Sequence, residues 1–318
     1  MKSTLIAAIT VAALASGPSV VSAASDIARI NDVGSQVMSA LDGRVVKITG
    51  AGPNHTLTLR RRDGSVQAVP GAPARPYRAV DLGHDASGKL VLTYIRCDDG
   101  VHCKAYVDDL TGNRRSFQSL TPAGCRLSSV PSRWRTRTAY GLLCDKPGGP
   151  PDVLDERRSG LFVRTGSGTP KRLLAPAGTA RRVDRVDLRA TIVGAVAPSN
   201  ESRAFTQTVD RAQLRSMKIT DNQGETDDWQ TQSMALGSNA RLWTLVVESQ
   251  EEGDVVTQRI SRRGPRTCEV EAIPVVVDPN THTAAIPFTA LAVDANTLYV
   301  DTPNGITPRA FTPAAACL

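Results

Sequence analysis

Aromatic residues are scarce in this chain, at 4% of 318 residues, and only three of them are tryptophan. Surfaces that hold neutral sugars or single-stranded nucleic acids usually stack the ligand on exposed aromatic rings, so neither kind of surface is expected. Lysine is also scarce, because the net charge of +7 comes from seven lysines and 31 arginines. This bias towards arginine is typical of a bacterial genome rich in G and C, and it weakens a nucleic-acid interpretation of the basic charge.

Long apolar runs are absent after the N-terminus, whereas a membrane-spanning helix needs about 20 apolar residues. Within the first two dozen residues, Lys2 is the only charge, an apolar run extends from Leu5 to Ala15, and small residues precede Ala24. Charge, apolar run and small residues in this order indicate a secretory signal peptide. We predict that residues 1–23 are removed, with cleavage after Ala24 as the alternative, and that the protein is extracellular or periplasmic.

The six cysteines form an even set, which in an exported chain indicates disulfides. Fifteen pairings are possible. The simplest pairing joins sequence neighbours: Cys97–Cys103, Cys125–Cys144 and Cys268–Cys317. No Cys-x-x-Cys pair occurs, so a metal site made of cysteines is not expected.

Motifs of catalysis and metal binding are missing. The four histidines, none at metal-ligand spacing, are His55, His84, His102 and His282. No Gly-x-Ser-x-Gly elbow or phosphate-binding glycine loop occurs. The acidic stretch from Asp221 to Asp228 lacks the residue order of a calcium loop. The sequence therefore predicts no catalytic residue, metal or cofactor.

Short β-branched runs separated by Gly, Pro, Asn and Asp fill most of the chain, and helical periodicity is nearly absent. Hairpin turns recur at a loose period of about fifty residues, marked by Gly64, Gly112, Gly168, Arg211, Gly264 and Gly305. Four strands per repeat of this length are typical of a β-propeller. We predict one all-β propeller domain of six four-stranded blades over residues 24–318, with a lead-in at 24–40 that is irregular or holds a short helical turn. Two β-sandwiches are the alternative.

One segment carries a family resemblance. The turn Asp85-Ala86-Ser87-Gly88-Lys89 opens a hydrophobic strand, and a later strand leads into Asp108-Asp109-Leu110-Thr111-Gly112. This pattern resembles one blade of the TolB-type periplasmic propellers, although His84 stands where that family usually has Pro. The resemblance covers residues 80–120 and weakens elsewhere. It implies a propeller fold and a non-enzymatic interaction module, because the motif builds the blade and carries no chemistry.

Three arginines alternate with other residues at Arg133, Arg135 and Arg137. On a single strand they would share one face at a spacing of about 7 Å, where they would repel unless they met acids or an anionic ligand. They are candidate contacts for an anionic ligand. The alternative is a solvated edge strand whose basic residues prevent sheet pairing.

Two hypotheses of function follow. The first is a monomeric binding or scaffold module that engages a protein or an anionic cell-envelope component, and no nucleic acid, at the loop face or the mouth of the central channel. The second is a hydrolase or lyase whose residues gather at that mouth from several blades. A buried cluster of His, Asp and Arg at the mouth would favour the enzyme, and a lining of small apolar residues would exclude it.

Overall fold

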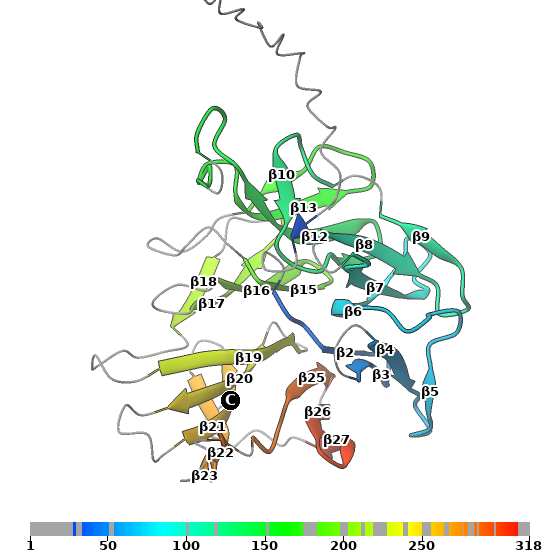
Figure 1. Ribbon diagram of the computed structural model, residues 1–318, viewed down its shortest axis with the longest axis vertical. Coiled ribbons are helices and arrows are strands. Elements are labelled where there is room, and N and C mark those ends of the chain that lie inside the picture. The colour runs from blue at the N-terminus through cyan, green and yellow to red at the C-terminus, as the bar shows by residue number, and fades with distance from the viewer. Residues whose placement is uncertain are drawn as a thin grey trace, which may run out of the picture.

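The protein is all-β in every part that the structure describes (Figure 1). The computed structural model describes residues 28–29, 34–50, 54–99, 102–117, 120–150, 153–173, 183–197, 203–210, 214–218, 228–237, 241–249, 256–263, 267–275, 277–278, 283–284, 286–295 and 297–310. Over these ranges, no helix is present that has the length and apolar character required to cross a membrane. The predicted signal peptide lies outside them and stays a prediction.

Successive strands form antiparallel meanders, each closed by short turns. The first sheet contains β2 (Met38–Leu41), β3 (Arg44–Thr49), β4 (Thr56–Arg60) and β5 (Val66–Ala68). In β4, Leu57 and Leu59 are buried while Thr56 and Thr58 are more exposed. This alternation is what a strand of period two produces when it packs on one face.

Two further meanders follow over residues 77–172. The first contains β6 (Tyr77–His84), β7 (Leu90–Arg96), β8 (His102–Asp108) and β9 (Arg114–Ser116). The second contains β11 (Ser132–Trp134), β12 (Arg137–Cys144), β13 (Gly160–Thr165) and β14 (Lys171–Arg172). One parallel pair, Trp134 with His84, joins them into a ten-stranded sheet. β1 (Ala28–Arg29) adds to β8, and β10 (Cys125–Leu127) adds to β12.

The remaining described strands repeat the pattern. The next sheet contains β15 (Arg185–Arg189), β16 (Ile192–Ala197), β17 (Arg203–Thr208) and β18 (Leu214–Lys218). After it come β19 (Asp228–Leu236), β20 (Leu242–Ser249), β21 (Val256–Arg263) and β22 (Thr267–Val275). A short pair, β23 (Val277–Asp278) and β24 (Thr283–Ala284), precedes a three-stranded sheet of β25 (Ala290–Asp294), β26 (Thr297–Thr302) and β27 (Gly305–Ala310).

The sheets close into a ring. Apolar side chains are buried between each sheet and the next, as where Val46 packs in one cluster with Leu82 and Tyr94. The last sheet returns to the first, because Ala290 lies in one buried cluster with Met38. The innermost strands β2, β6, β11, β15, β19 and β25 touch in this order, and β25 touches β2. A closed cycle of antiparallel sheets is a β-propeller, so the alternative of two β-sandwiches is wrong.

The sequence-based predictions about local structure can now be compared with the molecule. Disulfides Cys97–Cys103 and Cys125–Cys144 are confirmed, whereas Cys317 lies outside the described residues. The expected lead-in at 24–40 contains no helical turn over its described positions; it contains β1, and the first sheet already begins at Met38.

The recurring hairpin marks one position in the repeat. The turns at Gly64, Gly112 and Gly168 each join the third strand of a sheet to the fourth. The turn at Gly305 differs, because it joins the second and third strands of the last sheet. The turns at Arg211 and Gly264 lie outside the described residues.

Candidate functional site

A ring of buried polar residues surrounds the centre of the propeller. Each inner strand from β2 to β19 contributes one, namely Ser39, Asp81, Ser132, Asp187 and Ser233. Backbone N–H groups of the following inner strand donate to four of them: Leu82 to Ser39 (3.0 Å), Leu188 to Ser132 (2.7 Å), Leu236 to Asp187 (2.9 Å) and Leu291 to Ser233 (3.2 Å). A buried N–H without a partner costs free energy, so these side chains stabilise the junctions between sheets.

Two of the five are carboxylates, and both are almost fully buried, with exposures of 0% for Asp81 and 3% for Asp187. Ser39 donates to Asp81 Oδ1 at 2.8 Å, and the Ser132 hydroxyl also acts on this carboxylate. Burial raises the pKa of Asp81 to about 7, and the nearby Asp187 charge adds to the rise. Burial also raises the pKa of Asp187. Arg189 opposes both shifts, because its Nη1 lies 2.5 Å from Asp187 Oδ1.

The guanidinium of Arg189 spans three inner strands above this pair. It donates to the carbonyl oxygens of Leu82 (3.3 Å), Leu188 (3.1 Å) and Ala40 (3.2 Å). These carbonyls belong to β6, β15 and β2. Arg189 therefore ties the strands together and covers the two carboxylates from the end of the ring where β2 and β6 finish.

Residues 34–37 cross the other end of the same strands. Gly34 N donates to Ser128 O at 2.9 Å, and Gln36 O accepts from Val80 N at 2.8 Å. Arg185 Nε donates to Ser35 O at 3.0 Å. With this segment on one side and Arg189 on the other, the carboxylates are shielded from any substrate in this conformation.

The mouth above Arg189 carries a histidine–aspartate pair. Asp42 and Gly43 have φ values of 55° and 70° and join β2 to β3, as expected for Asp-Gly in a two-residue hairpin turn. This turn places Asp42 Oδ2 2.8 Å from His84 Nε2, at the end of β6. The ring of Trp134 lies edge-on to the His84 ring at 4.7 Å. His84 and Asp42 are therefore paired at this end of the ring, but the Asp42 side chain is 38% exposed, so the pair is not the buried cluster of His, Asp and Arg that would favour the enzyme.

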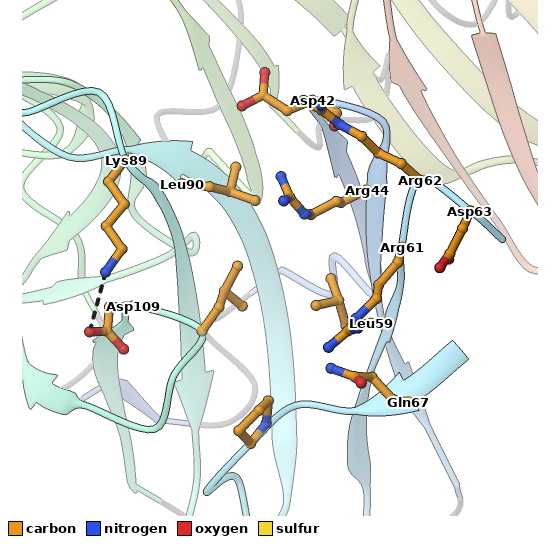
Figure 2. A pocket seen from close by; sticks show the side chains of 12 residues that line it. Asp42, Arg44, Leu59, Arg61, Arg62, Asp63, Gln67, Lys89, Leu90 and Asp109 are labelled. Atoms are coloured by element: carbon orange, nitrogen blue, oxygen red, sulfur yellow. Dashed lines mark hydrogen bonds and ion pairs between the residues drawn. The ribbon is translucent and has the colours of Figure 1, made fainter. Parts of the chain in front are cut away.

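A groove of about 580 Å³ opens between the first and second sheets (Figure 2). Its lining is Asp42, Arg44, Leu59, Arg61, Arg62, Asp63, Gln67, Pro70, Lys89, Leu90, Asp109 and Leu110. Arg44, Arg61 and Gln67 come from the first sheet, and Lys89 lies on the other side of the groove, where its Nζ is 3.7 Å from Asp109 Oδ2 (Figure 2). Among the described residues, the guanidiniums of Arg44 and Arg61 have neither an ion-pair nor a hydrogen-bond partner.

The acids at the rim of this groove are occupied by their own turns. Asp63 accepts from Ser65 N (2.9 Å) and Ser65 Oγ (2.7 Å), and these bonds lower the pKa of Asp63. Asp109 accepts from Thr111 N (2.9 Å) and Thr111 Oγ1 (2.6 Å), which lowers its pKa. The lowered pKa values keep both carboxylates ionised, and Lys89 is paired with Asp109. Arg44 and Arg61 are therefore the cations of this lining that have no ion-pair or hydrogen-bond partner among the described residues.

The prediction that Arg133, Arg135 and Arg137 share one face of a single strand is wrong. Arg133 lies in β11, Arg137 begins β12, and Arg135 sits in the turn between them with φ 54°. The chain reverses there, so strict alternation does not apply. Arg137 forms two contacts with Asp210, at 2.9 and 3.0 Å. Whether any of the three binds an anion stays a prediction.

The buried carboxylates were not found by sequence reasoning, although a signal exists. Val80-Asp81-Leu82 and Val186-Asp187-Leu188 are the same tripeptide, with an acid inside an apolar strand. Over the described ranges, no group of three His, Cys, Asp or Glu is placed to hold a metal ion. Positions 221–227 of the acidic stretch lie outside those ranges.

Comparison with known proteins gives weak structural likenesses. No family model matches, and no curated protein matches. An Aleuria aurantia lectin bound to a fucose disaccharide is 11% identical, with 89% of this chain and 98% of the lectin covered at a TM-score of 0.47.

A Hadza microbial sialidase is 8% identical, with 90% of this chain and 66% of the sialidase covered at a TM-score of 0.46. A Mycobacterium tuberculosis puromycin-hydrolysing peptidase is 11% identical, with 86% and 50% covered at a TM-score of 0.43. The propeller assignment therefore depends on the closed cycle of sheets in this chain, and none of these activities is transferred to it.

Proposed function

We propose that this protein is an exported, monomeric, non-enzymatic binding module that holds an anionic cell-envelope component in the groove between its first two sheets. The observation that carries the proposal is the pair of guanidiniums, Arg44 and Arg61, that line a groove of about 580 Å³ and have no ion-pair or hydrogen-bond partner among the described residues. Guanidiniums recognise carboxylate, sulfate and phosphate groups through paired hydrogen bonds. Two such groups on one wall favour an acidic ligand.

The proposal includes the finer architecture. Six blades over residues 24–318, with the signal peptide removed, agree with the six inner strands that touch in a cycle. The last sheet has three described strands in place of four. The TolB-type resemblance over residues 80–120 falls on β6–β9, a complete four-stranded unit, and export agrees with the two disulfides.

A protein partner is the less favoured ligand. Protein interfaces depend on a few buried aromatic or large apolar anchors. Over the described residues, only Val66 and Val153 are large, apolar and exposed. Arg133 and Arg135 remain candidate contacts at the β11–β12 turn, while Arg137 is already paired with Asp210.

The test is a binding measurement on the mature protein. Polygalacturonate supplies carboxylates on a sugar chain, and dextran is its neutral counterpart. We expect binding of polygalacturonate only, weakened by high salt and by Arg44→Ala with Arg61→Ala. Arg157→Ala is the matched control, because Arg157 is exposed in the β12–β13 connection. Equal binding of dextran, or no effect of the double variant, would contradict the proposal.

The second candidate function is a lyase or hydrolase at the channel mouth. The observation in its favour is the His84–Asp42 pair, in which the carboxylate orients the imidazole as it does in general-base sites. Incubation with polygalacturonate, followed by mass spectrometry of the products, tests it. Chain cleavage that disappears in His84→Gln would support the enzyme. Intact chains would contradict it and would favour the binding module.

A further inference from the structure

A second hollow lies beside the proposed binding groove. It measures about 280 Å³ and is lined by Asp85, Lys89, Val91, Val107, Asp108, Asp109, Asn113, Arg114 and Arg115. Lys89 and Asp109 line both hollows. The two are therefore neighbours, separated by the β6–β7 and β8–β9 turns that carry these residues.

The second hollow has three acids, Asp85, Asp108 and Asp109, and three bases, Lys89, Arg114 and Arg115. Lys89 Nζ lies 3.7 Å from Asp109 Oδ2 and Arg114 Nε lies 3.8 Å from Asp108 Oδ2, so Arg115 is the base of this lining that is left outside an ion pair. Arg115 is exposed on β9, and no partner for its guanidinium exists among the described residues. Arg133 lies in β11, which pairs with the end of β6 through Trp134 and His84, next to the turn that carries Asp85. Burial and the Arg115 charge lower the pKa of Arg133. Asp85 partly offsets this repulsion, but its carboxylate already accepts from Ser87 and from Lys89 N. An anionic group between Arg115 and Arg133 would relieve the repulsion.

Hairpin turns place all these cations at one end of the propeller. Arg61 lies in the β4–β5 turn, Lys89 follows the β6–β7 turn, and Arg133 precedes the β11–β12 turn. In an antiparallel meander, the turns between first and second strands and between third and fourth strands share one end of the sheet. The three residues therefore belong to one face of the ring, across three successive four-stranded meanders.

We infer that this face binds an extended acidic polysaccharide, whose chain runs from Arg44 and Arg61, past the Lys89–Asp109 ion pair, to Arg115 and Arg133. The inference rests on the proposed function and adds to it the length and class of the ligand. A polymer with a charge on each residue matches cations spread along a path, whereas one small anion needs only the first groove. A hydrated sugar acid also needs no apolar anchor, in agreement with the scarcity of exposed apolar side chains.

The experiment is a chain-length series. Affinities of galacturonic acid di-, tetra- and octasaccharides are measured by calorimetry for the wild type, for Arg44→Ala with Arg61→Ala, for Arg115→Ala and for Arg157→Ala. We expect affinity to rise with length in the wild type. Arg115→Ala should weaken the octasaccharide by about fivefold, the loss of one exposed charge contact, and leave the disaccharide unchanged. The double variant should weaken every length.

The outcomes separate the inference from the proposed function. Equal affinity for all lengths, with Arg115→Ala neutral, overturns the extended path and leaves a single-groove anion site. No binding of any length overturns both. A poly-glutamate peptide of matched charge is the second arm, and its binding as tightly as the octasaccharide would overturn the polysaccharide assignment in favour of an acidic protein segment.

Discussion

The substitution Asp81→Asn should remove the part of the pH dependence of folding stability that Asp81 contributes between pH 5 and 8. Asp81 is fully buried beside Asp187, and its pKa is raised from 3.8 to about 7. A carboxyl group whose pKa is raised on folding stabilises the protein fully below its unfolded pKa, and this contribution falls until the pH passes the folded pKa. The window of loss therefore runs from about pH 4 to about pH 7.

The magnitude follows from the shift. One unit of pKa corresponds to about 1.4 kcal/mol, so the rise to about 7 corresponds to about 4 kcal/mol in total. Of this, about 3 kcal/mol is lost between pH 5 and pH 8. Asparagine keeps an oxygen that can accept from Ser39, and it removes the negative charge that faces Asp187.

The assay is urea unfolding of the wild type and Asp81→Asn at pH 5, 6, 7 and 8. Between pH 5 and pH 8, the free energy of unfolding of the wild type should fall by about 3 kcal/mol more than that of the variant. Asp98→Asn, which removes an exposed carboxylate from the Cys97–Cys103 hairpin, is the matched control and should follow the wild type. Parallel curves for wild type and Asp81→Asn would refute the argument, because the buried carboxylate would then contribute no pH dependence.

Three other predictions concern the stability of the ring. Arg189→Met should lower the free energy of unfolding in urea at pH 8 by about 3–5 kcal/mol, because it leaves the buried carboxylates without their cation. A loss below about 1 kcal/mol would contradict this role of Arg189. Joint replacement of Cys125 and Cys144 by Ala should cost about 3 kcal/mol, since that disulfide closes a loop of 19 residues, and an unchanged thermal midpoint would speak against it. Gly83→Ala should cost about 1–3 kcal/mol, because its Cβ would lie 2.0 Å from Arg133 O across the β6–β11 junction; calorimetry at neutral pH is the check.

Local sequence patterns predicted the parts of the fold that depend on local chemistry. Asp-Gly and Thr-Gly turns at Gly64 and Gly112 indicated hairpins because glycine accepts positive φ. The disulfide Cys97–Cys103 joins the ends of a different hairpin, the one between β7 and β8. The prediction that residues Arg133–Arg137 form a single strand failed for a related reason. An alternating pattern looks the same whether the chain continues or turns, and only the positive φ of Arg135 separates the two.

The central polar ring could not be predicted in the same way. The coupling of Asp81 with Asp187 depends on two strands that are distant in sequence and meet only when the ring closes. Their pKa values come from burial, which is a property of the assembled sheets. The groove could not be predicted for the same reason, because Arg44 and Lys89 line one groove only through the packing of two neighbouring blades.

The cycle of buried clusters has a consequence for how the molecule comes apart. A linear array of repeats frays from its terminal units, each of which has a single neighbour. Here the cluster that joins Ala290 to Met38 gives the last sheet and the first sheet two neighbours each. Opening any one junction exposes apolar surface on both flanking sheets, and each of those sheets is still held by its other neighbour. The inner-strand amides of β2, β6 and β15 should therefore exchange with solvent at similar rates, through one shared opening event.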